Sequence, residues 1–137
     1  MHPDMRLEMI TDADVATALV TGVEKLKSET TDKNQAYILA GGENNGWRFI
    51  GEEFFSRLFA AFSLPPPDRC YFTRDINAYH LDWYDTSESQ REFSYQNTTI
   101  EDYFNHLRKQ FGVFSLPIRL FQKIIMKEIL KRSPYHH

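Results

Sequence analysis

The chain has 137 residues, which suits one domain, and a globular chain of this length buries roughly 65–70% of its unfolded surface. Its eleven Phe, seven Tyr and two Trp residues supply large apolar surfaces for a core or for a partner. The single Cys70 excludes an internal disulfide. Residues 1–20 lack a secretory signal, and no apolar run reaches ~18 residues, so we expect a cytoplasmic protein.

The net charge of −3 hides an asymmetry along the chain. Residues 1–105 hold 9 Lys and Arg against 18 Asp and Glu, whereas residues 106–137 hold 7 against one. A basic end on an acidic body indicates an anionic partner, contact with the body itself, or simply a solvated basic helix face. We expect no nucleic-acid binding, because the body is acidic and the basic residues gather near one helix.

The first predicted element is a helix from Asp12 or Asp14 to about Ser28. Either Asp can accept hydrogen bonds from the free amides of the first turn. Apolar residues at helical spacing predict the buried face. They are Val15, Leu19, Val23 and Leu26, with Ala16 and Val20 beside them. The polar residues 28–34 predict a loop.

The second element is a strand at Ala36–Ala40, closed by Gly41-Gly42. It has no polar alternation, which is typical of a strand covered on both faces in a parallel sheet. Gly41–Gly46 then forms an irregular loop. An aromatic-rich helix follows from about Trp47 to Phe62, and a triple proline at 65–67 makes a stiff connector.

Residues 70–84 alternate loosely and predict one or two short strands. A short helix is predicted from Asp85 to Phe93, capped by Asp85, Thr86 and Ser87. Thr99–Asp102 resembles a capping box and opens a helix to about Gln110. Pro117 suits the first turn of a last helix, which ends near Arg132.

These elements predict an α/β (α+β) fold with about five helices and a few short strands. We divide the chain into a domain at residues 1–112 and a basic amphipathic helix at residues 113–137. That helix combines a row of cations with an apolar face. We favour core packing for it over docking in an oligomer, and both over contact with a membrane.

Four groups of residues occur in an order that resembles one known family. Arg6–Ile10 with Asp14–Ala16 resembles its "R-x-D-F-V-x-V-x-D-V-A", and Tyr37–Glu43 resembles its "Y-N-I-G-G-G-E". Trp47-Arg48 resembles its "T-W-R-E-L". The fourth group resembles "L-D-T-S-K-A-R-R-E-L-G-W-x-P-x-x-S-L-E-E-G" and consists of Leu81–Ser87, Arg91–Tyr95 and Thr99–Asp102. The family is that of the NAD-dependent epimerases and dehydratases, the extended short-chain dehydrogenases/reductases.

The resemblance covers residues 6–107 and implies the C-terminal, substrate-side portion of such an enzyme. The family's glycine-rich NAD(P)-binding turn and its catalytic Tyr-x-x-x-Lys pair have no match here. We therefore expect a chain that is inactive alone, with no catalytic, cofactor-binding or metal-binding residues. It would be a truncation, one product of a split gene, or one chain of a two-chain enzyme. The alternative is a stand-alone interaction or assembly module derived from that domain.

Two arginines are the substrate-binding residues that the resemblance implies. Arg74 lies where nucleotide-sugar enzymes of the family grip the substrate diphosphate, and Arg6 matches a second arginine near the substrate. The simpler interpretation of Arg74 is an ion pair with Asp75 or Asp82. The expected substrate is a nucleotide sugar, with a steroid or other small hydrophobic carbonyl compound as the alternative.

In the family, the strand that corresponds to Ala36–Ala40 and the first helix pack on the cofactor domain's sheet. Here these surfaces would be uncovered, which is unfavourable for backbone groups and apolar side chains alike. We therefore expect a homo-oligomer or a missing cofactor-binding chain. The contact would lie at or near Tyr37, Ile38, Leu39 and the helix at residues 117–132.

Overall fold

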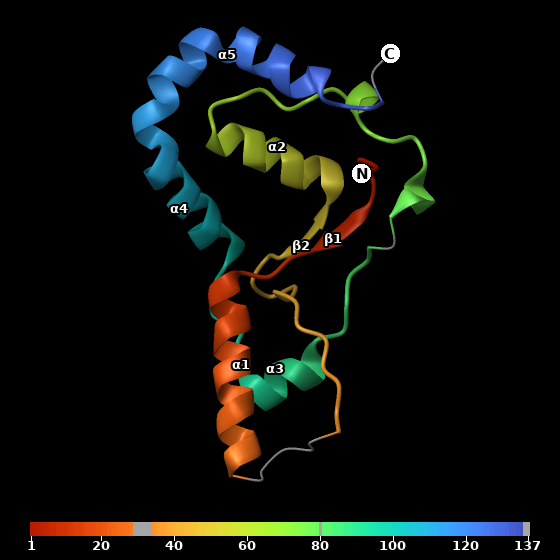
Figure 1. Cartoon of the computed structure of the whole chain (residues 1–137), viewed down its shortest axis with the longest axis vertical. Coiled ribbons are helices and arrows are strands. Elements are labelled where there is room, and N and C mark those ends of the chain that lie inside the picture. Colours follow the sequence, from red (N-terminus) through yellow and green to blue (C-terminus); the bar gives the residue numbers. More distant parts are fainter. Residues whose placement is uncertain (29–33, 80, 136–137) are drawn as a thin grey trace. The chain divides into compact units, whose positions relative to one another are not determined.

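The structure is a computed structural model that describes residues 1–28, 34–79 and 81–135 (Figure 1). Within these residues it contains five α-helices and one two-stranded sheet, which confirms the predicted α/β (α+β) class. No helix among them is long and apolar enough to cross a membrane. The chain forms two compact units. Unit 1 comprises Met1–Arg6, Phe49–Leu81 and Glu101–His137, and unit 2 comprises Leu7–Arg48 and Asp82–Ile100.

The sheet pairs β1 (Arg6–Glu8) with β2 (Arg48–Ile50). Hydrogen bonds flank it from Met9 N to Trp47 O and from Gly51 N to Met5 O, so the two strands run antiparallel. The helix predicted from Trp47 is therefore wrong over its first four residues. Trp47 and Phe49 are buried while Ile50 is exposed, and this alternation is the period of a strand.

Unit 2 is built around α1 (Asp12–Lys27) and α3 (Ser87–Phe93). Ala18 of α1 packs with Phe93 and Tyr95, and this cluster is widened by Ile10, Tyr37 and Leu39 at its edge. Gly22 of α1 faces the same ring, since a Cβ there would lie in ordinary van der Waals contact with Phe93 at 3.6 Å.

The N-cap of α1 is Thr11, not Asp12 or Asp14 as predicted. The Thr11 hydroxyl accepts a hydrogen bond from Asp14 N at 3.1 Å. Asp14 has another role because its side chain turns inward and is buried. There its carboxylate accepts hydrogen bonds from Asn97 N, Thr98 N and the Thr98 hydroxyl. Asp14 is the third residue of α1, and its hydrogen-bond partners lie in a segment that is distant in the sequence. The local sequence therefore does not predict that this carboxylate is buried.

The predicted strand at Ala36–Ala40 is absent. No strand among the described residues pairs with this segment, and side chains of unit 2 hydrogen-bond to part of its backbone instead. Tyr95 Oη donates to Ala40 O at 2.9 Å and accepts from Ala40 N at 3.1 Å. The Ser89 hydroxyl donates to Ile38 O at 2.7 Å. The following residues form the predicted irregular loop, in which a Cβ at Gly41 would lie 2.3 Å from the Trp47 ring.

Unit 1 contains α2 (Gly51–Ala61), α5 (Ser115–Lys131) and all of α4 (Ile100–Phe111) except its first residue. Short 3₁₀ turns lie at η1 (Arg69–Tyr71), η2 (Ile76–Ala78) and η3 (Gly112–Phe114). In Figure 1, α4 and α5 form a continuous arc around α2. The core is aromatic, with Phe54 of α2 between Phe49 and Phe104 at centroid distances of 5.6 and 6.3 Å.

The strands predicted within residues 70–84 are also absent from the described part of the chain, which leaves out residue 80. Polar side chains form local turns there instead of a ladder. Asp75 accepts a hydrogen bond from Asn77 N at 2.9 Å, and Thr73 accepts one from Asp75 N at 3.2 Å. The prediction is wrong because a loose alternation of apolar residues does not determine which groups accept the backbone hydrogen bonds, and here side chains of the same segment accept them. The predicted helices at α3, α4 and α5 are confirmed, while most of the predicted loop at residues 28–34 lies outside the described residues.

Candidate functional site

Both predicted substrate-binding residues lie on the surface of unit 1. Arg6 is on β1 and Arg74 follows η1, and both side chains are exposed. Arg74 forms no salt bridge with the neighbouring Asp75, whose carboxylate holds the η2 turn. The structure brings no cavity to either arginine among those described below. Arg74 is thus an exposed cationic group that lines neither of these two cavities.

A third arginine is engaged instead. Arg69 donates to both oxygens of Asp4 and to both oxygens of Glu52 in unit 1. These hydrogen bonds lower the pKa of the Glu52 carboxyl and raise the pKa of the Arg69 guanidinium. Arg69 therefore ties the N-terminal segment to the start of α2 and has a structural role.

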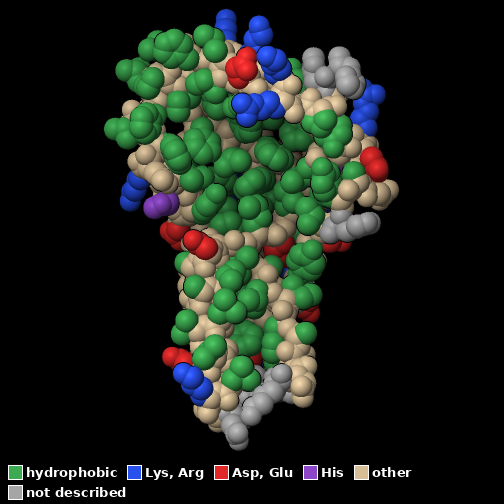
Figure 2. Space-filling model, in the orientation of Figure 1, with side chains coloured by type: hydrophobic (Ala, Val, Ile, Leu, Met, Phe, Trp, Pro, Cys, Tyr) green, Lys and Arg blue, Asp and Glu red, His purple; other side chains and the backbone are tan. Residues whose placement is uncertain are grey.

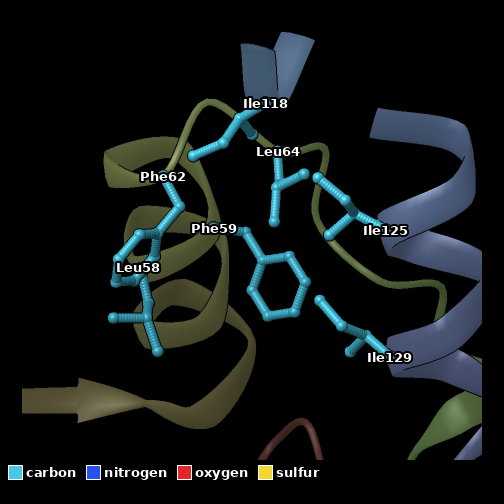
Figure 3. A pocket seen from close by; sticks show the side chains of 7 residues that line it. All are labelled: Leu58, Phe59, Phe62, Leu64, Ile118, Ile125 and Ile129. Atoms are coloured by element: carbon cyan, nitrogen blue, oxygen red, sulfur yellow. The ribbon is translucent and has the colours of Figure 1, made fainter. Parts of the chain in front are cut away.

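Unit 1 also holds an apolar cavity of about 410 Å³. Its side chains come from α2 and the residues after it on one side and from α5 on the other, and they point toward one another (Figure 3). The lining residues are Leu58, Phe59, Phe62, Leu64, Ile118, Ile125 and Ile129. This volume falls in the range of small-molecule pockets. Because every lining side chain is a hydrocarbon, the cavity can bind apolar matter but offers no acid, base or anion ligand.

Two buried carboxylates lie in unit 2, and neither is available for chemistry. The Glu8 side chain is fully buried and accepts hydrogen bonds from Gly42 N at 3.0 Å, Arg48 Nε at 3.1 Å and Tyr84 N at 2.8 Å. Asp14 is satisfied by the segment at Asn97-Thr98 in the same way. Each carboxylate joins segments that are distant in the sequence, which is a structural function.

Sequence reasoning missed the Glu8–Arg48 pair. Arg48 also donates to Glu43 and to Tyr84 O, so it holds three segments of unit 2 together. The available signal was the place of both residues on strands beside buried neighbours, at Leu7 and at Trp47. Among the described residues no three His, Cys, Asp or Glu side chains could hold a metal ion, and the free Cys70 thiol is exposed.

An unexpected apolar surface belongs to α1, whose predicted core face is exposed. Leu19 and Val23 are 62% and 50% exposed, and Val20 and Leu26 lie on the same side. The buried side is the opposite one, with Asp14, Ala18 and the half-buried Lys25, whose amine donates to Glu92 at 3.2 Å. Hydrophobic side chains are visible over this region in Figure 2. We call Leu19, Val20, Val23 and Leu26 the outer α1 face.

The chain matches no protein-family model, and no curated protein or solved structure is significantly similar to it.

Proposed function

We propose that the chain is the substrate-side domain of an oxidoreductase of the NAD-dependent epimerase/dehydratase type, and that a separate cofactor-binding domain docks on the outer α1 face. The exposure of that face carries the proposal. Four large aliphatic side chains on one side of a regular helix are costly to leave in water, and such patches mark interaction sites.

The position of this face supports an oxidoreductase origin. In the resembled family, the first helix and the strand after it pack on the sheet of the cofactor domain. Here α1 turns its aliphatic side outward, and Ile38 in the following extended segment is 56% exposed. The neighbouring Tyr37 and Leu39 pack on the unit 2 core, so Ile38 is the part of that segment available for docking.

The residues present indicate which steps this chain and the partner domain would each perform. The partner domain would supply the dinucleotide site and the proton donor, and this chain would position the substrate. The exposed Arg74 suits the diphosphate of a nucleotide sugar, because a guanidinium donates two parallel hydrogen bonds to a bidentate anion. The apolar cavity between α2 and α5 suits the alternative substrate class, a hydrophobic carbonyl compound. By itself the chain should bind no NAD or NADP in a calorimetric titration.

The test begins with the DNA on both sides of the coding region, which should encode a domain with a glycine-rich turn and a Tyr-x-x-x-Lys pair. Co-expression of that domain with this chain should give a stable complex that reduces or oxidises NAD(P). Val23→Glu should disrupt the complex without unfolding the chain, because Val23 contacts water in the free chain. The matched control is Ile76→Glu, since Ile76 is also 50% exposed but lies in unit 1. The absence of such a domain from the flanking DNA would contradict the proposal.

The second candidate function is an assembly module. It is favoured by the same outer α1 face, which can pair with a second copy of itself by two-fold symmetry. The two functions differ in ligand binding, because both allow the isolated chain to form a dimer through Val23. A chain that forms this dimer but binds neither nucleotide sugars nor hydrophobic ketones is an assembly module.

A further inference from the structure

A second exposed apolar surface lies in unit 1, at η3 and the first half of α5. Its six side chains are each 56–81% exposed. They are Val113, Phe114, Leu116, Leu120, Phe121 and Ile124. We call them the α5 patch. Figure 2 shows hydrophobic side chains gathered over the junction of α4 and α5. The opposite side of α5, with the buried Met126, faces the unit 1 core.

Cations follow the α5 patch at a fixed helical spacing. Leu116, Leu120 and Ile124 form one row along the helix, and Arg119, Lys123 and Lys127 are each three residues further on. Residues three apart are neighbours on a helix surface, so each apolar side chain has a cation beside it. Glu128 is the single acidic residue among residues 106–137, which also include 7 Lys and Arg.

The cation row borders a hollow on its other side. Lys123, Lys127 and Lys131 line an open cavity of about 590 Å³ together with Tyr71, Met126 and Leu130. Three lysine side chains that line one hollow favour an anion there. Lys123 and Lys127 thus lie between the α5 patch on one side and this hollow on the other.

We propose that η3 and α5 bind the surface of an anionic phospholipid bilayer. The α5 patch enters the hydrocarbon at the headgroup boundary, and the lysines extend to the lipid phosphates. Amphipathic helices that lie in the membrane interface have this combination of Phe and Leu with Lys and Arg. Lysine stems can cover apolar surface while the amine stays in water. A protein partner fits less well, because Lys is depleted in protein–protein interfaces.

Flotation with lipid vesicles tests the proposal on the full chain. We expect binding to vesicles of phosphatidylcholine mixed with phosphatidylserine and none to phosphatidylcholine alone. Added salt should weaken the binding, because it screens the lysines from the phosphates. Lys123→Gln should lower the affinity about 5-fold, which corresponds to the ~1 kcal/mol that one cation contributes near an anionic surface. Leu120→Ser should lower it roughly 10-fold or more.

The matched controls change the same kind of side chain elsewhere. Lys27→Gln removes one positive charge from α1, and Ile76→Ser removes an exposed apolar side chain from η2. Both should bind as the unchanged chain does, and circular dichroism should show all four variants folded. Equal binding to both vesicle types, or equal losses in the control variants, would overturn the proposal. The proposal would also be overturned if the chain floats with neither vesicle type and forms a dimer that Leu120→Ser converts to a monomer. The α5 patch would then bind a second copy.

Discussion

At the scale of single residues, unit 2 depends on carboxylates that the sequence pattern places at the surface. Asp14 is in the first turn of a helix, where an exposed acid commonly serves as a cap. Its burial instead leaves three donors of the Asn97-Thr98 segment dependent on one side chain. Since the partners lie 83 and 84 residues away in the sequence, this side chain determines where the chain returns to α1.

Asp14→Asn tests that role. The change puts an amide donor where an acceptor is needed, so we expect unfolding free energy to fall by about 1.5–3 kcal/mol, the usual contribution of a hydrogen bond to a charged group. Asp12→Asn is the matched control, because Asp12 is exposed in the same helical turn and also carries a negative charge. Its effect should stay within about 0.5 kcal/mol. Equal effects in urea unfolding would show that helix-terminus charge, not the buried hydrogen bonds, is responsible.

Arg74 is exposed, so its predicted role is in substrate binding and not in stabilising the fold. We expect Arg74→Ala to leave the melting temperature nearly unchanged. The binding of a UDP-sugar should become weaker by about 1.5–3 kcal/mol, the range for a charged hydrogen bond. Titration calorimetry measures the second effect. Arg91→Ala is the control, since Arg91 is an exposed arginine on α3 of unit 2. A large loss of stability without a change in affinity would assign Arg74 to the fold.

At the scale of elements, the segment at residues 36–40 shows how side chains can replace a missing neighbouring strand. Ala40 donates and accepts through one hydroxyl, that of Tyr95, which is completely buried. Gln96 Nε2 adds a second hydrogen bond to Ala40 O at 2.8 Å. Three backbone groups of the segment are thus hydrogen-bonded by side chains of residues 89–96, which position it without a sheet.

Tyr95→Phe should release this segment while leaving the helices in place. The Ala40 amide loses its acceptor, so its hydrogen exchange should become much faster, and unfolding free energy should fall by about 1–3 kcal/mol. Native-state hydrogen exchange followed by NMR measures both. Tyr79→Phe is the control, since Tyr79 is 44% exposed and lies in unit 1. If Ala40 stays protected in the Tyr95 variant, the segment is held by the packing of Tyr37 and Leu39 and by the hydrogen bonds from Ser89 and Gln96.

The helices were predictable because their signals are local: an apolar period near 3.6 and Pro117 in a first turn. The faces of the helices were not. Leu19 and Val23 have the spacing of a core stripe, but Ala18 and Gly22 are small enough for α3 to approach, and that side became the buried one. The strand at 36–40 failed for a related reason, since an apolar run indicates burial without specifying whether a strand or side chains will accept its hydrogen bonds.

The candidate sites divide in the same way. Arg6 and Arg74 came from a motif order, which is local, and the structure leaves them apart from any described cavity. The Glu8–Arg48 pair and the cavity between α2 and α5 join segments that are far apart in the sequence. Their residue types were visible in the sequence, but their proximity depends on tertiary packing and could not be predicted from spacing.

At the scale of the whole molecule, the two units differ in charge. Unit 2 holds 5 Lys and Arg against 11 Asp and Glu, and unit 1 holds 11 against 8. The basic excess of unit 1 comes from α5 and the residues around it. Their inner side also covers Phe59, Phe62 and Leu64 at the cavity. Deletion of residues 113–137 should therefore expose an aromatic surface and cause aggregation, measurable by light scattering.

The last prediction concerns the assembly of the isolated chain. Without a cofactor-binding domain, the outer α1 face remains in water, and the acidic unit 2 of one copy can attract the basic unit 1 of another. We expect a light-scattering mass above the 16.2 kDa of one chain, approaching two chains as the concentration rises.

Val23→Glu should restore the mass of one chain, because it places a charge in the apolar contact. Ile76→Glu, at a similarly exposed site, should leave the mass unchanged. High salt should weaken the association but not abolish it, since screening removes the attraction between units and leaves apolar burial intact. A mass of one chain at all concentrations and salt levels would show that the outer α1 face is tolerated in water and that neither copy nor partner is needed to cover it.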